Sequence, residues 1–561
     1  MVKNNTRKRF ILFGISLFSF VFGAFVWNKV EQLPITIDML NQAQKLFGLE
    51  FTQPQKEQML TTLDKQAKIY QELRNLKLPN SVVPALNFNP IPVGFVDPDM
   101  RKYSSFKLSK LTTPVKLPAD KAELAFYTIR ELAELIRTKQ ITSVELTRFF
   151  LDRLKKYNAK LLFVVNFREE LALNEAARAD AEIKAGKYRG VLHGIPFGVK
   201  DLLSTSDTKT TFGAAPYRDQ ELKVDATVVK RLQDAGAILI AKLTLGELAM
   251  GETWFGGMTR NPWNITQGSS GSSAGPASSV SAGCLPFAIG SETLGSIVSP
   301  SDRCGVTGLR PSFGRVSKYG AMALSWSMDK LGPITHSVED AAIVFNTIQG
   351  TDPKDLSTIN WSFAYDGNVK KDLKGWKIGY LKTSFSNKYL NPVNDSVTLV
   401  KLKELGATLI PIELPSLPAS AIGLVLDAEA GAAFQDLILD NRADMLAQQG
   451  KDSWPNVFRC AQFILAVEYI NAQRARTLLI QQWYEKLKGL DLYVAPSFSS
   501  NLRLTNLTGN PCVVVPNGFK NGQPTSITFN GQLFGEGKTL EAAKIYQDAT
   551  DFHKKHPSLN F

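Results

Sequence analysis

Histidine and cysteine are both scarce in this chain of 561 residues, which contains four of each. No histidine stands at metal-ligand spacing from a cysteine, which argues against a metal site. The cysteines show no close pairing pattern, and a chain of this length does not need disulfide crosslinks for stability. We therefore expect them to be mostly buried small apolar residues. They are Cys284, Cys304, Cys460 and Cys512.

Acidic residues are outnumbered, and the formal net charge is +13. Residues 1–30 supply five cations and no acid, and the remaining excess is scattered along the chain among acids. A nucleic-acid partner is not expected, because it would need a basic stripe with stacking aromatics. Hydrophobic residues make up 44% of the chain, which is enough for a sizeable core.

An uncharged apolar stretch of 18 residues, Phe10–Trp27, follows the basic N-terminal residues. This pattern is typical of an export signal or a membrane anchor, whereas a buried core helix at a chain end rarely begins among cations. Because no clear cleavage site follows, an uncleaved anchor stays open beside export. With the positive charge kept inside, the rest of the chain would lie outside the cytoplasm. We predict an extracytoplasmic protein, with possible membrane association through residues 10–27.

Proline content and hydrophobic periodicity divide the chain into four segments. Apolar residues at helical spacing follow a capping pair, Thr52 and Gln55, and seven prolines between Leu78 and Lys121 exclude regular helix there. The predicted segments are a signal peptide or membrane anchor (1–30), a helical appendage (31–77), a proline-rich extended connector (78–121) and the main domain (122–561).

The main domain alternates helical and strand patterns. Amphipathic helices are predicted over 129–136 and after a cap at Thr142 or Ser143. Short apolar runs predict buried strands. The runs are 237–241, 285–289, 376–380 and 492–495. This alternation predicts an α/β fold with a mixed sheet.

Residues 268–283 read GSSGSSAGPASSVSAG and consist almost entirely of glycine, serine and alanine. Such composition alone is most often a flexible linker. Here the run lies between NPW at 261–263 and CLPFAIG at 284–290, which places it inside the folded body. Small residues in that position let backbones approach closely and turn tightly.

Two serines and one lysine are the candidates for chemistry. A serine hydroxyl needs a neighbouring base, and no histidine lies nearby in the sequence. A lysine can act as that base only when neutral, and the apolar neighbours of Lys200 would lower its pKa. Each residue also has an ordinary structural reading. Lys200 could pair with Asp201, Ser272 could cap a helix beginning near Ala274, and Ser296 could be a turn serine.

The segment 261–308 resembles the signature motif of the amidase signature family. HGIPFGVKD (193–201), SMDKLGPITHSVEDAA (327–342) and NLTGNPCVVVPNGF (506–519) resemble further segments of that family, in the same order. The resemblance covers about residues 122–549. It implies an amidase-signature fold, a large mixed twisted β-sheet surrounded by helices, with no cofactor.

Residue by residue, the resemblance implies Ser296 as nucleophile, Ser272 as the bridging serine after a cis peptide bond, and Lys200 as the base. Backbone N–H groups in a tight turn would stabilise the oxyanion. They belong to Thr293, Leu294, Gly295 and Ser296. His193 is expected to form a hydrogen bond in the turn before Lys200. Glu429, Tyr469 and Arg474 also fall in family-like segments, and we assign them packing roles.

Two positions depart from the commonest family pattern. Leu294 replaces the first of two glycines and would be strained if its φ had to be positive. Val298 replaces an arginine that would contact the acid at Glu292. We expect Arg303 to supply that cation instead.

These residues predict a hydrolase that cleaves a small-molecule carboxylic amide to a carboxylate and ammonia or an amine, through an acyl-serine intermediate. One alternative is an amidotransferase A-type subunit that releases ammonia for aminoacyl-tRNA, because GAMALSWSMDKLGP (320–333) also resembles that branch. The other is a catalytically silent binding protein on the same scaffold, which the departures at Leu294 and Val298 suggest.

Overall fold

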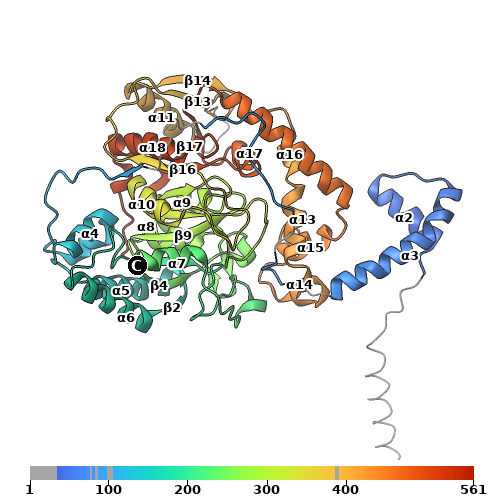
Figure 1. Ribbon diagram of the computed structural model, residues 1–561, viewed down its shortest axis with the longest axis horizontal. Helices are drawn as coiled ribbons and strands as arrows, with labels where there is room; N and C mark the ends of the chain where they lie inside the picture. The colour runs from blue at the N-terminus through green and yellow to red at the C-terminus, as the bar shows by residue number, and fades with distance from the viewer. Residues whose placement is uncertain (1–33, 76–78, 83–85, 98–104, 386–390, 561) are drawn as a thin grey trace, which may run out of the picture. The chain divides into compact units, whose positions relative to one another are not determined.

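Figure 1 shows the computed structural model of the chain. It describes residues 34–75, 79–82, 86–97, 105–385 and 391–560. The predicted signal or anchor, residues 1–30, lies outside the described residues. Among the residues that are described, no helix has the length and apolar character needed to span a membrane. The chain forms two compact units, divided between Leu78 and Pro79. The predicted domain boundaries stay predictions.

The described residues of the first unit form helices α2 (Ile37–Phe47) and α3 (Gln53–Asn75). The backbone N–H of Thr52 donates to Gln55 Oε1 at 2.7 Å, so the predicted capping pair lies at the start of α3. Lys56 Nζ of α3 donates to Asn41 Oδ1 of α2 at 2.7 Å and links the two helices.

The described proline-rich residues after Pro79 belong to the second unit and bond to its main part. The Asn80 side chain exchanges two hydrogen bonds of 2.8 Å with the backbone of Ala323. Strand β1 (Ser105–Lys107) pairs in parallel with β12 (Ala364–Asp366). The shortness of β1 agrees with a segment whose prolines cannot donate to a ladder.

Both predicted N-terminal helices of the main domain are confirmed. Helix α4 (Ile129–Arg137) and helix α5 (Ser143–Leu161) each begin with a reciprocal capping box. In α5 the Thr142 side chain accepts from the backbone N–H of Glu145, whose carboxylate accepts from Thr142. This arrangement satisfies backbone donors that the first helical turn leaves free.

A mixed sheet of 11 strands forms the centre of the second unit, in the order β14-β13-β15-β17-β16-β10-β11-β9-β3-β4-β2. Its strands are β2 (Val164–Phe167), β3 (Pro196–Lys200), β4 (Ile238–Leu243), β9 (Phe287–Glu292), β10 (Thr307–Arg310), β11 (Lys330–Thr335), β13 (Lys377–Leu381), β14 (Thr408–Ile412), β15 (Leu492–Pro496), β16 (Cys512–Lys520) and β17 (Gln523–Gly531). The four predicted strands correspond to β4, β9, β13 and β15. Strand β9 begins two residues later than predicted.

Helices surround this sheet (Figure 1). The remaining α-helices are α6 (Glu169–Lys184), α7 (Thr227–Asp234), α8 (Ala274–Ser281), α9 (Val298–Cys304), α10 (Val338–Ile348), α11 (Pro392–Glu404), α12 (Ala419–Ile422), α13 (Leu424–Ala433), α14 (Gln435–Leu439), α15 (Trp454–Ala461), α16 (Ala466–Leu487), α17 (Asn501–Thr508) and α18 (Glu536–Thr550). Two-stranded ladders join β5 (Thr253–Trp254) to β6 (Gly257–Met258) and β7 (Arg260–Asn261) to β8 (Asn264–Gly268). The predicted α/β fold with a mixed sheet is confirmed.

The glycine- and serine-rich run lies inside this body, as predicted. Its second half forms the fully buried helix α8, which packs against α9 and the neighbouring strand β9. Small side chains are required there because α8 approaches the sheet closely. A Cβ on Gly275, for example, would lie 2.5 Å from the backbone nitrogen of Thr244.

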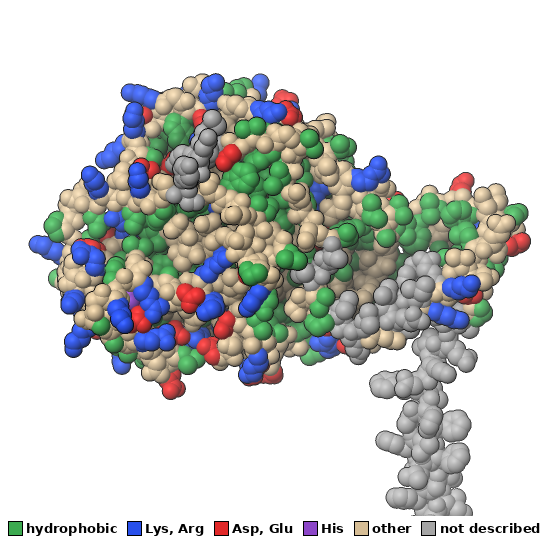
Figure 2. All heavy atoms as spheres, in the orientation of Figure 1, with side chains coloured by type: hydrophobic (Ala, Val, Ile, Leu, Met, Phe, Trp, Pro, Cys, Tyr) green, Lys and Arg blue, Asp and Glu red, His purple; other side chains and the backbone are tan. Residues whose placement is uncertain are grey.

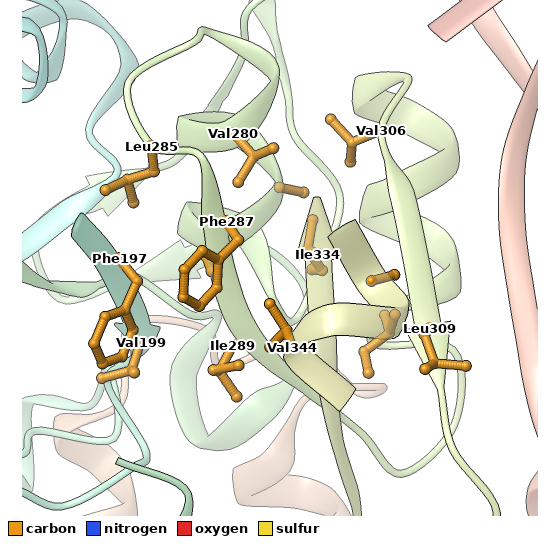
Figure 3. Packing of buried hydrophobic residues seen from close by; sticks show 14 of the residues in the cluster. Phe197, Val199, Val280, Leu285, Phe287, Ile289, Val306, Leu309, Ile334 and Val344 are labelled. Carbon is orange, nitrogen blue, oxygen red and sulfur yellow. The ribbon is translucent and has the colours of Figure 1, made fainter. Parts of the chain in front are cut away.

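The core beside the run is built from adjacent strands β3 and β9. Phe197 and Phe287 stack with their ring centroids 5.3 Å apart, and Val199 and Ile289 follow along the same strands (Figure 3). Both phenylalanines are fully buried. Their packing fixes the two strands side by side near the start of each strand.

Charged side chains on the visible face of the molecule are mixed in sign (Figure 2). Lysines and arginines are spread over it with acids between them, rather than gathered in one stripe. The four cysteines are free thiols, and all except Cys460 are buried.

Replacing Phe287 by alanine should destabilise the second unit by about 3–5 kcal/mol, because it removes a stacked ring and leaves a cavity between β3 and β9. Urea unfolding followed by circular dichroism measures this change. Leu356 is 77% exposed, so Leu356→Ala is the matched control and should stay within about 0.5 kcal/mol of the wild type. Equal stability of the two variants would contradict this account of the core.

Candidate active site

Lys200 is the last residue of β3, and its side chain is fully buried. Its Nζ atom lies 2.7 Å from Ser272 Oγ, 2.8 Å from Ser291 Oγ and 3.3 Å from Ser273 Oγ. The lysine therefore ends among three hydroxyl groups, with no carboxylate in hydrogen-bond contact among the described residues.

Burial lowers the pKa of Lys200 to about 7, because the ammonium ion loses its hydration. The negative charges of Asp329 and Glu292 act in the opposite direction and favour the ammonium form. A lysine with this pKa is present in both neutral and charged forms near neutral pH. It can therefore accept and return a proton, as a general base must.

Asp201, the alternative partner of Lys200, points elsewhere. Its Oδ1 lies 2.9 Å from Nζ of Lys242, and its Oδ2 accepts from the backbone N–H and the hydroxyl of Thr211. Adjacent residues at a strand end project to opposite faces of the sheet. Lys242 and Asp201 thus form a buried ion pair, whereas the amine of Lys200 contacts only hydroxyl groups among the described residues.

Ser272 and Ser273 lie at the turn into helix α8. The peptide bond between Gly271 and Ser272 is cis, as the resemblance implied. Neither serine caps the helix, since the N-cap residue, Ser273, makes no capping hydrogen bond with its side chain. Instead Ser273 Oγ donates to the carbonyl of Ser291 at 3.0 Å and accepts from the Ser291 N–H at 3.1 Å.

Ser296 lies between β9 and α9 and is 8% exposed. Its carbonyl oxygen accepts from the backbone N–H of Ser273 at 3.1 Å, which ties it to the residue that follows Ser272. Within the described residues, Ser296 Oγ and Ser272 Oγ do not form a hydrogen bond with each other. Catalytic hydrogen bonds of this kind are often long until substrate binds.

The turn 293–296 offers four consecutive backbone N–H groups. None of them donates to another protein group within the described part of the chain. Gly295 has a φ of +89°, and it is this glycine that makes the turn possible. Leu294 has no positive φ, so the replacement of a glycine there causes no backbone strain.

Glu292 holds the far end of this turn. One carboxylate oxygen accepts from the N–H groups of Ile297 and Val298, both at 2.9 Å, and the other accepts from Arg310 Nη1 and Asn506 Nδ2, both at 2.7 Å. Burial alone would raise the pKa of Glu292, but the Arg310 charge and these donors lower it to about 2. The carboxylate is therefore ionised and fully hydrogen-bonded.

The prediction that Arg303 supplies the cation for Glu292 is wrong. Arg303 Nη1 instead lies 3.4 Å from Gln267 Oε1. The ion pair with Glu292 is made instead by Arg310, at the end of β10. In the sheet β10 is separated from β9 by β11, so the two residues meet through the strand order.

The remaining family-like residues have structural contacts. His193 Nδ1 accepts from the backbone N–H of Arg189 at 3.1 Å, in the turn before β3, as predicted. Glu429 accepts from Ser325, Ser327 and Tyr469, whereas the exposed Arg474 donates to Asn471 Oδ1 at 3.0 Å.

Sequence reasoning missed Ser291, Asp329 and Arg310 at this site. Ser291 carries a weak signal, since it stands in the same short motif as Ser296. The other two become neighbours of the turn only through sheet pairing. Gly290 must also lack a side chain because of a residue distant in sequence, since a Cβ there would lie 2.7 Å from Ser273 Oγ.

Comparisons with known proteins agree with this geometry. The profile of the Amidase family matches residues 145–540. The A-type subunit of the glutamyl-tRNA(Gln) amidotransferase of Coxiella burnetii is 33% identical in an alignment of 483 positions that covers 77% of this chain and 99% of that protein.

Solved structures give the same answer. The native peptide amidase from Stenotrophomonas maltophilia superposes with a TM-score of 0.71 at 30% identity, covering 79% of this chain and 100% of that one. The A-type subunit of the glutamyl-tRNA(Gln) amidotransferase from Thermotoga maritima shares the fold, with a TM-score of 0.66 at 24% identity over 80% of this chain and 100% of that one. With its profile match, its relatives and its serine- and lysine-containing site, the chain belongs to the Amidase family, whose enzymes act on carbon–nitrogen bonds.

Proposed function

We propose that this protein is an amide hydrolase that works through an acyl-Ser296 intermediate. The observation that carries the proposal is the buried Nζ of Lys200, 2.7 Å from Ser272 Oγ and without a carboxylate partner in the described part of the chain. Burying an amine without a charged partner costs free energy, and this cost points to a role for the amine in the site. Its hydroxyl contacts and its pKa of about 7 suit proton transfer.

In the proposed reaction, neutral Lys200 takes the proton of Ser272 while Ser272 takes that of Ser296. Ser296 Oγ then attacks the amide carbon, and the oxyanion is held by the N–H groups of residues 293–296. The relay returns the proton to the amide nitrogen, the carbon–nitrogen bond breaks, and ammonia or an amine leaves. A water molecule loses its proton to the same relay and attacks the ester, which releases the carboxylate and restores Ser296.

Three hydroxyls around Nζ suit both states of the lysine. The ammonium ion has three N–H donors, which match the oxygens of Ser272, Ser273 and Ser291. Ser273 gives its own proton to a carbonyl and can only accept from the lysine. Neutral Lys200 can keep two of these contacts and still present its lone pair to Ser272. The charge can therefore form and disappear without a large rearrangement.

Two other functions compete with a plain hydrolase. An amidotransferase subunit that passes ammonia to a partner is favoured by the amidotransferase relatives at up to 33% identity. A catalytically silent binding protein was suggested by Leu294 and Val298. It is disfavoured because Leu294 is unstrained and Arg310 replaces the missing cation.

The proposal includes export or membrane anchoring by residues 1–30. Its support is the basic start followed by 18 uncharged apolar residues. Hydrolysis of a small-molecule amide would then take place outside the cytoplasm, where aminoacyl-tRNA is absent, and this favours the hydrolase over the amidotransferase.

Ser296→Ala should lower kcat for amide hydrolysis at least about 1,000-fold and abolish covalent labelling by a fluorophosphonate, because the attacking oxygen is gone. A panel of linear amides and C-terminally amidated peptides provides the assay. Ser299→Ala is the matched control, since Ser299 lies on the adjoining helix α9, where its hydroxyl bonds to Ser270, and its loss should leave activity unchanged.

Each competing function has its own outcome in that experiment. A silent scaffold would not be labelled in the wild type. An amidotransferase subunit would be labelled but would release ammonia efficiently only with a second subunit present. Undiminished hydrolysis by Ser296→Ala would refute the proposed nucleophile.

The rate should depend on the protonation of Lys200. Because only the neutral amine accepts a proton, kcat/KM should rise about tenfold per pH unit below pH 7 and level off above it. A neutral amide substrate keeps the titration on the enzyme. Lys200→Arg should lose activity at every pH, since a guanidinium stays protonated. A flat profile between pH 5 and about 8 would contradict the base assignment.

Removing residues 1–30 should change where the protein accumulates. The complete chain is expected outside the cytoplasm or in the membrane fraction, and the shortened chain in the cytosol, as measured by cell fractionation and protease accessibility. Finding both in the cytosol would refute export and would favour the amidotransferase.

A further inference from the structure

Asp329 is a buried acid beside the candidate active site. The proposed reaction does not use its carboxylate. Asp329 immediately precedes β11, which pairs antiparallel with β9 so that Lys330 lies opposite Glu292. The next residues outward, Asp329 and Thr293, are therefore brought together by the register of the sheet. The Thr293 hydroxyl donates to Asp329 Oδ1 at 2.6 Å.

The ionised form of Asp329 is the one that its contacts favour. In addition to Thr293, the backbone N–H groups of Leu324 and Ser325 donate to Oδ2 at 2.8 and 3.0 Å. Burial raises the pKa of this carboxyl, but three donors and no acceptor leave no place for an acid proton. The charge of the nearby Lys318 also lowers the pKa of Asp329 and favours the negative charge.

The loop that carries Asp329 is itself fixed. Glu429 accepts from Ser325 Oγ at 2.6 Å and from the N–H and hydroxyl of Ser327 at 3.0 and 2.7 Å. Arg476 donates to the Ser327 hydroxyl and carbonyl at 2.8 and 2.9 Å. Asp329 therefore cannot retreat from the turn without breaking several buried hydrogen bonds.

Thr293 is the first residue of the turn 293–296, and Glu292, immediately before it, anchors the other end at Ile297 and Val298. The turn is thus held from both sides by buried carboxylates. Asp329 and Glu292 are also the two negative charges that act on Lys200.

We infer that Asp329 is a positioning residue: it holds the Thr293 side chain so that the turn keeps its N–H groups in place, and it presents its negative charge to Lys200. The inference rests on the proposed function and adds a residue to it. Asp329 touches neither the nucleophile nor the base. It acts through Thr293 by contact and on Lys200 through space.

The two effects can be separated by two substitutions. Asp329→Asn removes the charge and should move the acid limb of the kcat/KM profile about one pH unit lower, because neutral Lys200 then forms more easily. Thr293→Val removes the contact and keeps the charge. It should lower kcat about 10- to 100-fold, as for a displaced oxyanion donor, with KM and the acid limb unchanged. Thr293→Ser should restore most of the rate.

Asp340→Asn is the matched control, because Asp340 is also a buried acid but is not among the charges that act on Lys200. It should leave the acid limb in place. A wild-type limb in Asp329→Asn, or wild-type kcat in Thr293→Val, would overturn the inference. If Asp329→Asn does not fold, the Thr293 pair decides alone. These results are distinct from a failure of the proposed function, in which Ser296→Ala would stay active.

Discussion

The burial of Lys200 among hydroxyl groups is the constraint on which the rest of this site depends. A lysine amine removed from water loses much of its preference for the charged form, and no carboxylate among the described residues touches it to restore that preference. Its environment must nevertheless tolerate the ammonium form, because the proton has to rest there during each turnover. Three hydroxyls in contact and two carboxylates at longer range meet both requirements.

The order of the strands explains why these groups meet. Strands β11, β9 and β3 are consecutive in the sheet. Strand β9 ends at Glu292 and β3 at Lys200, and Asp329 immediately precedes the antiparallel β11. The base, the charged frame of the turn and the start of the nucleophile loop therefore belong to one edge of one sheet. The stacked Phe197 and Phe287 fix β3 against β9 a few residues before that edge. A shift of β3 by one residue would turn the Lys200 side chain to the other face of the sheet, away from its serines.

Local sequence patterns predicted the parts of this arrangement that depend on neighbours in the chain. The helices α4 and α5, the cap of α5 at Thr142, the buried strand β4 and the crowded run 268–283 all follow from residues within a few positions of one another. The pairings across the sheet did not follow from such patterns. Arg303 was expected to meet Glu292 because it is close in sequence, but Arg310 reaches it from β10 and Asn506 reaches it from α17. Asp329 likewise meets Thr293 only because β11 pairs with β9.

Two buried lysines on neighbouring strands show how narrowly the chemistry is confined. Lys242 on β4 and Lys200 on β3 are both fully buried, and burial lowers the pKa of each. Lys242 faces Asp201 at 2.9 Å, so its ammonium form is held in an ion pair and is unsuited to accept a proton. Lys200, one residue before that aspartate, projects to the other face and meets only hydroxyls. Because Lys200 and Asp201 point to opposite faces of the sheet, Asp201 pairs with Lys242, and Lys200 remains available as a base.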